Sequence, residues 1–592
     1  MATSYRQWIV WIVSLISFVS GAIIDTRTIQ SVHNTSYDYI ILGGGTAGLV
    51  VASRLSEDPE TTVLVVEAGD FERTNPNVTD PSGLGIGKNT RVDWNYDTAP
   101  QIYGGNESIV YSAGKGLGGS SLINDLWPSL GLELDWNKIF TYSKQSENFH
   151  APPPNLTALG ASYEADDHGF SGLLSTCFSN HITPGDTHEI FNTTMKKFGI
   201  QPRHEFNGGD LNGFGVQQVT QDPVADIRED AARAYYYPFM NRKNLVAMVN
   251  TTATRIIWGQ DSSDGSAVAS AAEISSSTGE ISTIQANKEI ILSAGALRSP
   301  AILEHSGVGN PSILSRQSID AKINLPSVGE NLQDQTTMAT LASNANNVTI
   351  PGLPAFVAFV SLEDLFGSNT SSLYNNTLSK IPSYASTIAA QNGGSSSATV
   401  QERLLKSQLD LLFRSNTPTS EIVPAAIQSF TAVVFWPLQP FSRGSVHIQS
   451  PNATLQPKID PKFFQFDFDT QVAVATAKFS RRFLTTSPVV DTIDLSTLSP
   501  SFEDIPEDAD DEVWADWVKN KSNYQPNYHH LGTCAMLPRE LGGVVDNEFR
   551  VYGTKNVRVV DLSVIPLQVA GHSTSLLYGV AEWAAEKIRG AV

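Results

Sequence analysis

The stretch YIILGGGTAGLVVASRL, residues 39–55, places a glycine-rich turn between a short apolar run and an amphipathic segment. Residues 39–42 predict a buried strand, LVVASRL has the spacing of a helix, and TTVLVVEAG predicts a second buried strand that ends in Glu67. Strand, glycine-rich turn, helix and strand in this order form the first unit of a doubly wound parallel sheet. The sequence therefore predicts an α/β fold with a Rossmann-like domain.

The glycine-rich turn has the composition that a dinucleotide pyrophosphate requires. Gly43 permits a tight turn, Gly45 lets the backbone approach the pyrophosphate, and Gly48 lets the helix pack closely on the sheet. The helix N-terminus adds unpaired N–H groups. Glu67 follows Gly48 by nineteen residues, where its carboxylate can accept hydrogen bonds from an adenosine ribose but would repel a 2′-phosphate. The pattern predicts binding of FAD or NAD rather than NADP.

The acidic composition excludes one class of partner. The chain has 592 residues, with 39 Lys and Arg against 60 Asp and Glu, and a formal net charge of −21. Because a polyanion is repelled by nucleic acid, we expect no nucleic-acid partner. The length predicts several domains or one large composite unit.

The N-terminal residues are typical of a secretory signal peptide. Arg6 precedes an apolar run at residues 8–19 that is too short to span a bilayer, and small residues follow at Ser20 and Ala22. We predict cleavage after Ala22, delivery to the cell exterior or to a vesicle or vacuole lumen, and no stable membrane span. An uncleaved signal anchor is the alternative. Eleven N-x-S/T sequons predict N-linked glycans.

The chain has two cysteines, Cys177 and Cys534, which could form one disulfide. Because Cys534 lies in an apolar motif, we expect two free, inert thiols. No CxxC and no second His/Cys cluster accompanies NYHHLGTC, so we predict no metal site.

Four stretches in this order resemble the glucose–methanol–choline family of flavin oxidoreductases. They are GGGTAG with EAG, DWNYDTAPQ with GKGLGGSSLIN, GALRSPAILEHSGVG with VGENLQD, and NYHHLGTC with VVDLSVIPLQVAGHST. They extend over almost the whole chain. The resemblance implies an FAD-binding domain assembled from discontinuous segments, and an α+β substrate-binding domain in which a sheet is backed by helices.

The order of these motifs predicts the domain boundaries. After the signal peptide at residues 1–22, we expect the FAD-binding domain at residues 36–130, 241–334 and 528–592, and the substrate-binding domain at residues 131–240 and 335–527. Residues 383–399 are rich in Ser, Ala and Gly and predict a mobile surface loop.

The resemblance also assigns contacts with FAD. It places residues 43–48 at the phosphates, residues 124–127 beside the flavin ring, Ala253 at the adenine and Leu562 at the ribityl–pyrophosphate region. It places backbone N–H groups of Ser573 and Thr574 at the pyrimidine end of the flavin. The complete set of predicted contacts is Gly43, Gly45, Thr46, Ala47, Gly48, Glu67, Ala68, Ser120, Asn124, Asp125, Leu126, Trp127, Ala253, Leu562, Ser573 and Thr574.

Two departures from the family pattern concern the flavin. Covalent members carry a histidine where this chain has Leu122, so we predict non-covalent FAD. The run NDLWP differs from the usual Asn-Gly sequence and places Trp127 one position early, so we expect an atypical loop beside the flavin.

The family pattern His-x-x-Gly-Thr identifies His529 as the catalytic base, with His572 as the partner that holds the substrate oxygen, and leaves His530 as a packing residue. Oxidation of an alcohol removes an O–H proton and a C–H hydride. The flavin N5 accepts the hydride, and a histidine with a pKa near 6.5 suits the proton.

The sequence around His529 also bears on the substrate. Glucose oxidases share GTCxMxPxExGGVVDxxxRVYG with this chain but carry an arginine where it has Gln525, which argues against glucose. We predict oxidation of an alcohol or lactol of a polyketide-like or aromatic secondary metabolite, as in relatives of the patulin synthase type, with O₂ or another electron acceptor. The alternative is a ring closure without net redox change, as in the versicolorin B synthase type. The oligomeric state, monomer or homodimer, stays open.

Overall fold

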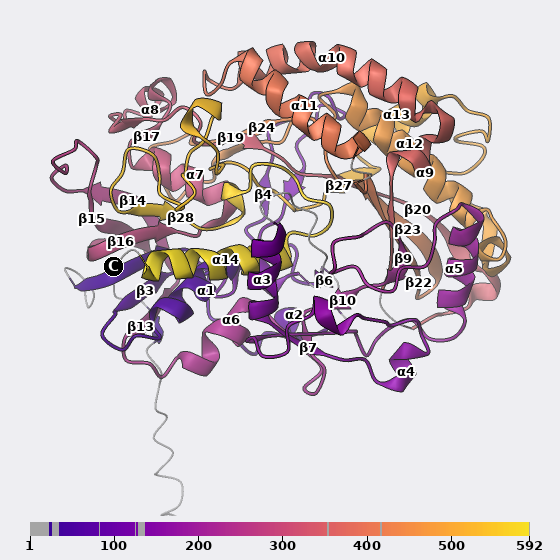
Figure 1. Ribbon diagram of the computed structural model, residues 1–592, viewed down its shortest axis with the longest axis horizontal. Helices are drawn as coiled ribbons and strands as arrows, with labels where there is room; N and C mark the ends of the chain where they lie inside the picture. The colour runs from indigo at the N-terminus through magenta and orange to yellow at the C-terminus, as the bar shows by residue number, and fades with distance from the viewer. Residues whose placement is uncertain are drawn as a thin grey trace, which may run out of the picture.

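Two large β-sheets, each with its own layer of helices, organise the chain (Figure 1). The computed structural model describes residues 23–25, 35–81, 83, 85–124, 126–127, 136–351, 355–414 and 417–590. The predicted signal peptide and the predicted cofactor contact Asp125 lie outside these residues.

The first sheet is built around parallel strands, as the N-terminal pattern predicts. Its order is β1 (Ile23–Asp25), β13 (Leu245–Val249), β3 (Val63–Val66), β2 (Ser36–Leu42), β16 (Ile281–Leu292), β15 (Ala269–Ser276) and β14 (Thr251–Trp258), with β28 (Val557–Val559) paired to β16. The two predicted strands are confirmed as β2 and β3, and every residue of β3 is buried. An apolar run of this kind is expected for a parallel strand covered on both faces.

Helices α1 (Thr46–Leu55), α14 (Thr574–Arg589) and α3 (Trp136–Ser146) pack together against this sheet. The Arg54 guanidinium of α1 makes two 2.8 Å hydrogen bonds to the Glu582 carboxylate of α14. The Tyr235 hydroxyl also donates to Glu582, at 3.0 Å. The two helices therefore meet through a paired and fully hydrogen-bonded carboxylate, although they lie more than five hundred residues apart.

The second sheet is antiparallel and has one face toward helices and one toward a cavity. Its order is β26 (Ile493–Ser499), β20 (Thr336–Asn344), β23 (Phe430–Pro437), β22 (Ser420–Ile427), β21 (Phe356–Val360) and β9 (Gly213–Val216), with β27 (Tyr524–Pro526) paired to β20. Along β23, Val433 and Phe435 belong to the core beneath α12 (Asp467–Leu484), while Val434 and Trp436 line the cavity. This alternation follows the two-residue period of a strand. The predicted domain boundaries themselves stay a prediction.

The predicted surface loop at residues 383–399 is in large part helical. Helix α10 (Thr370–Gln391) continues through it, and α11 begins at Ala398 and ends at Arg414. Composition alone hides the helical spacing of Ile381, Ala385 and Ile388, which pack with buried leucines of α11. That prediction was wrong for the first part of the segment.

Cys177 and Cys534 are both free and buried, which confirms the prediction of two unpaired thiols. Burial raises the pKa of the Cys177 thiol to about 12, so this cysteine stays protonated at neutral pH. In the part of the chain that the structure describes, no helix is long and apolar enough to cross a membrane.

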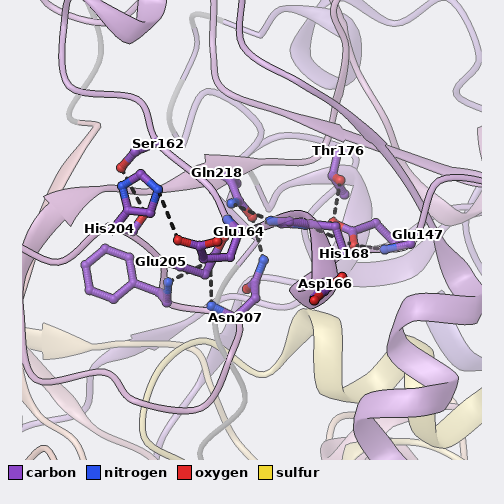
Figure 2. A network of polar contacts seen from close by, with 12 residues as sticks. Glu147, Ser162, Glu164, Asp166, His168, Thr176, His204, Glu205, Asn207 and Gln218 are labelled. Carbon is purple, nitrogen blue, oxygen red and sulfur yellow. Dashed lines mark hydrogen bonds and ion pairs between the residues drawn. The ribbon is translucent and has the colours of Figure 1, made fainter.

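A buried histidine, His168, lies between two carboxylates beside a smaller sheet (Figure 2). The sheet consists of β6 (Leu126–Trp127), β10 (Gln218–Val219), β8 (Leu174–Cys177) and β7 (Glu147–His150). His168 Nε2 lies 2.9 Å from Glu205 and its Nδ1 lies 3.2 Å from Glu147. Although burial favours the neutral ring, hydrogen bonds to Glu147 and Glu205 raise the pKa of His168 to about 9.

This cluster predicts a loss of stability at alkaline pH. Because the folded-state pKa of His168 is raised, its stabilisation is fully present below pH 6.5 and is lost as the pH rises through about 9. We expect the free energy of unfolding to fall by about 3 kcal/mol over this range, measured by urea unfolding. The control is E147Q/H168Q/E205Q, which has no titratable group in the cluster. An equal loss of stability in this variant and in the wild type would contradict the assignment.

Candidate active site

A hollow of about 1080 Å³ lies where β2 and β3 end and α1 begins. Its lining residues from the first sheet and its connections include Gly43, Gly45, Thr46, Ala47, Glu67, Ala68, Ser120, Ala253 and Leu562. These nine predicted cofactor contacts come from five separate segments of the sequence. The fold therefore brings them to one place, at the carboxyl ends of parallel strands where such folds bind their ligands.

The turn between β2 and α1 depends on glycine at two positions. Gly43 has a φ of +111°, a region that favours glycine. A Cβ atom on Gly48 would lie 2.2 Å from the Gly43 carbonyl oxygen, so only glycine permits this approach of helix and turn. Gly48 itself does not line the hollow. It permits the close approach of α1 to the turn, and residues of that turn line the hollow.

Glu67 sits at the end of β3 with its carboxylate against the backbone. Its two oxygens accept hydrogen bonds from the Gly44 and Gly69 N–H groups, at 2.9 and 2.7 Å. Burial raises the pKa of Glu67 to about 7 in spite of these bonds. A third backbone N–H, that of Gly116, also interacts with this carboxylate, which keeps acceptor capacity for a ribose hydroxyl.

A second hollow, of about 1350 Å³, continues from the first. The two share lining residues Thr46, Ala113, Ser120, His530, Leu562 and Leu577. The second hollow adds the cavity face of the antiparallel sheet and brings together the predicted residues Asn124, His529, His572, Ser573 and Thr574. Together they form one elongated site that begins at Glu67 and ends at the two histidines.

His529 is oriented by a chain of amide groups. Its Nδ1 lies 2.8 Å from Gln335 Oε1. The Gln335 amide is fixed because its Nε2 donates to the Leu438 carbonyl at 2.9 Å, so its oxygen faces the ring. The Asn527 amide donates to the same oxygen at 2.9 Å. Asn527 Nδ2 also lies 2.9 Å from His529 Nδ1, where it would donate to an unprotonated nitrogen. We assign the proton to Nδ1, because the Gln335 oxygen can only accept and the Asn527 amide already donates to that oxygen; the lone pair is then on Nε2, as a base requires.

The backbone of His529 is held equally firmly by Asp334. The Asp334 carboxylate accepts the N–H of His529 at 2.9 Å, the N–H of Tyr528 at 3.2 Å and the hydroxyl of Tyr111 at 2.7 Å. Tyr528 has a φ of +64°, in the left-handed region that a tyrosine seldom adopts. The carboxylate therefore stabilises a strained turn just before the candidate base.

The electrostatic surroundings keep the His529 ring neutral. Burial lowers its pKa well below the usual value, and the nearby His572, His530 and Lys88 lower it further. Burial also lowers the pKa of His530 to about 4. A neutral imidazole can accept a proton at any pH above its pKa.

His572 faces His529 across the site, with ring centroids 4.9 Å apart. Its Nε2 lies 2.8 Å from the fully buried carboxylate of Glu421 on β22. The ring of Trp436 packs edge-on against both imidazoles, with centroids 5.5 Å from His572 and 6.5 Å from His529. The carboxylate fixes the orientation of His572 and leaves its Nδ1 for a ligand.

Helix α14 begins at the wall of the second hollow. Ser573 is its N-cap residue, and the Ser573 side chain makes no capping hydrogen bond. Both Ser573 and Thr574 line the hollow. The positive end of a sixteen-residue helix therefore faces the place where the resemblance puts the pyrimidine end of the flavin.

The structure describes part of the loop expected beside the flavin ring. Asn124 lines the second hollow, and Leu126 and Trp127 form β6, which pairs with β10. Four residues of the site had no assigned role in the sequence: Lys88, Gln335, Glu421 and Trp436. Gln335 directly follows the VGENLQD motif, which is the one signal that could have indicated it. Strand register in the antiparallel sheet brings Glu421 and Trp436 to the site, and the course of its loop brings Lys88 there.

Comparisons with known proteins agree with this geometry. The family model of the GMC oxidoreductase N-terminal region matches residues 37–337, and that of the C-terminal region matches residues 440–581. The chain belongs to the GMC oxidoreductase family. It is therefore a flavoprotein oxidoreductase with FAD as its cofactor, as predicted.

Curated relatives of this family member match over nearly the whole chain. Glucose oxidase-like protein fsoC of Humicola fuscoatra is 40% identical over 571 residues, covering 94% of this chain and 96% of that protein. A glucose oxidase of Aspergillus carbonarius is 32% identical, covering 93% and 92%.

Solved structures agree on the architecture. A fungal aryl-alcohol oxidase is 25% identical, with a TM-score of 0.81, covering 94% of this chain and 99% of that chain. An FAD-dependent oxidoreductase of Chaetomium thermophilum is 24% identical, with a TM-score of 0.83 and the same coverage. Both support the predicted pairing of a Rossmann-like FAD domain with a substrate domain.

The residues present fit FAD. Along the elongated site, buried polar atoms of Ser293 and His530 have no hydrogen-bond partner among the described residues, as expected where a bound group completes them. Glu67 offers acceptors at one end, and the α14 N-terminus offers donors at the other.

Replacement of Glu67 by Gln should weaken FAD binding. The amide would set an NH₂ group against one of the two backbone N–H donors and would lose the charged acceptor for the ribose. We expect a roughly 10- to 100-fold higher dissociation constant for FAD, measured by quenching of flavin fluorescence during reconstitution. The exposed Glu60→Gln is the control. Unchanged affinity in Glu67→Gln would remove Glu67 from the cofactor site.

Proposed function

We propose that this flavoprotein oxidises a CH–OH group of an aromatic or polyketide-like alcohol, with His529 as the base and His572 as the group that holds the substrate oxygen. The observation that carries the proposal is the pair of convergent imidazoles in one cavity, in which burial lowers the pKa of His529 and its Nδ1 lies 2.8 Å from the Gln335 oxygen. Bound FAD would supply the acceptor of the hydride and pass the electrons to O₂ or another acceptor.

The protein groups divide the remaining work. His529 Nε2 accepts the hydroxyl proton, while Gln335 keeps the ring turned toward the substrate. His572, whose Nε2 stays paired with Glu421, donates from a protonated Nδ1 to the same oxygen and so fixes the carbon that loses the hydride. The helix α14 N-terminus supports the negative charge that reduction brings to the cofactor.

The lining of the cavity supports an aromatic substrate over a sugar. Gln525 lines the cavity where the glucose oxidases that the sequence resembles carry an arginine. The wall also contains the rings of Trp436 and Tyr528 and the side chains of Val434 and Leu577. Such surfaces favour a planar apolar body with few hydroxyls.

Replacement of His529 by Ala tests the proposed base. Without a proton acceptor, the rate at which an aryl alcohol bleaches the 450 nm flavin band anaerobically should fall roughly 10²- to 10⁴-fold. FAD content should stay unchanged. His181→Ala, at a partly exposed histidine paired with Asp226, is the control.

Two outcomes of that experiment contradict the proposal. A wild-type bleaching rate in His529→Ala would discard the assignment of the base. If the wild type forms product without any bleaching of the flavin, the proposed oxidation is wrong and the alternative function, a ring closure without net redox change, takes its place.

Replacement of Gln335 by Glu should shift the pH dependence of flavin reduction. In the wild type the pKa of His529 lies well below 6.5, and the base works above its pKa, so the acid limb should lie below pH 6.5. A carboxylate beside Nδ1 favours the imidazolium and should move the acid limb up by about 1 to 3 pH units. Gln335→Met, which adds no charge, should slow the reaction without this upward shift. An unmoved limb in Gln335→Glu would contradict the role of Gln335.

A further inference from the structure

Lys88 lines the second hollow together with His529 and His572. Its ammonium nitrogen lies 4.1 Å from the ring centroid of Tyr528, the residue next to the candidate base. Burial lowers the pKa of Lys88, and its charge in turn lowers the pKa of His529. A cation therefore stands within electrostatic reach of the candidate catalytic ring.

The loop before Lys88 sets its position. Gly87 packs so closely that a Cβ atom there would lie 2.5 Å from the Ile123 side chain, in the segment next to the predicted flavin loop. Asn89, on the other side, donates its N–H to Asp93 at 3.0 Å. The backbone at Lys88 is thus held between two fixed neighbouring residues.

No carboxylate neutralises Lys88 among the described residues. The described part of the cavity lining contains no Asp or Glu, and no described carboxylate lies within ion-pair distance of the ammonium group. Asp93 attracts it from a distance, but its carboxylate already accepts hydrogen bonds from Asn89, Asn95, Ser112 and Ala113.

Two other carboxylates lie behind the wall and are also engaged. Asp334 accepts the bonds that hold Tyr528 and His529, and Glu421 bonds to His572. In a chain with a net charge of −21, a partly buried lysine that has no ion-pair partner among the described residues is unusual. A ligand anion would supply such a partner.

We infer that Lys88 selects substrates that carry an anionic oxygen, a carboxylate or phenolate, on the aromatic body. The inference rests on the proposed function, since it takes the second hollow as the substrate site. Trp436 and Tyr528 would contact the ring, and Lys88 would pair with the anionic group while His529 and His572 meet the alcohol.

Binding of benzoate and benzamide to the holoenzyme tests the inference without turnover. The two probes have nearly the same shape and differ in charge. From the flavin difference spectrum we expect roughly 10- to 100-fold tighter binding of benzoate to the wild type. The preference should disappear in Lys88→Met, persist in part in Lys88→Arg, and shrink with added salt.

Lys138→Met is the matched control, because Lys138 also lies over an aromatic ring, that of Trp583 at 4.8 Å, and neither residue lines the cavity. It should keep the wild-type preference for benzoate. Equal binding of both probes to the wild type, or an unchanged preference in Lys88→Met, would overturn the inference.

Loss of FAD from Lys88→Met would assign Lys88 to the cofactor and would also overturn the inference. Failure of the proposed oxidation has a separate readout: no alcohol bleaches the flavin. The preference for benzoate can still be measured in that case.

Discussion

Asp334 and Gln335, two consecutive residues, hold the backbone and the ring of His529 at the boundary between the two large sheets. Asp334 accepts the His529 N–H and Gln335 accepts its Nδ1–H. Gln335 is followed at once by β20 of the antiparallel sheet, and β19 (Glu330–Leu332), just before Asp334, pairs with β24 (Gly444–His447) in a separate small sheet. The candidate base is therefore fixed by the two residues that connect these sheets, and movement of one sheet against the other would misplace it.

The features that could be predicted from the sequence are those specified by residues that lie close together in the chain. The βαβ unit can be read because an apolar run, three glycines and a helix follow one another within residues 39–66. The cofactor contacts that line the hollow could be named because each lies inside a short motif. His529 and His572 belong to the same class, since their motifs are local even though the two rings meet across the site.

The partners of those histidines could not be predicted, because strand register brings them there. Glu421 lies opposite Trp436 on adjacent strands, so both reach His572 from one face of the antiparallel sheet. Lys88 comes from a loop whose path depends on the close contact of Gly87 with Ile123. For residues 383–391 the local composition gave a wrong prediction. It is typical of a loop, but the segment is helical because α10 packs on α11.

The central claim is that the His529 ring is neutral and carries its proton on Nδ1. Long-range ¹H–¹⁵N correlation spectra of the FAD-bound protein, labelled with ¹⁵N-histidine and assigned by comparison with His529→Ala, test it directly. The account predicts the neutral Nδ1–H tautomer for His529 at pH 6.5, because burial lowers its pKa and Gln335 accepts from Nδ1. A doubly protonated ring, or a proton on Nε2, at that pH would contradict it.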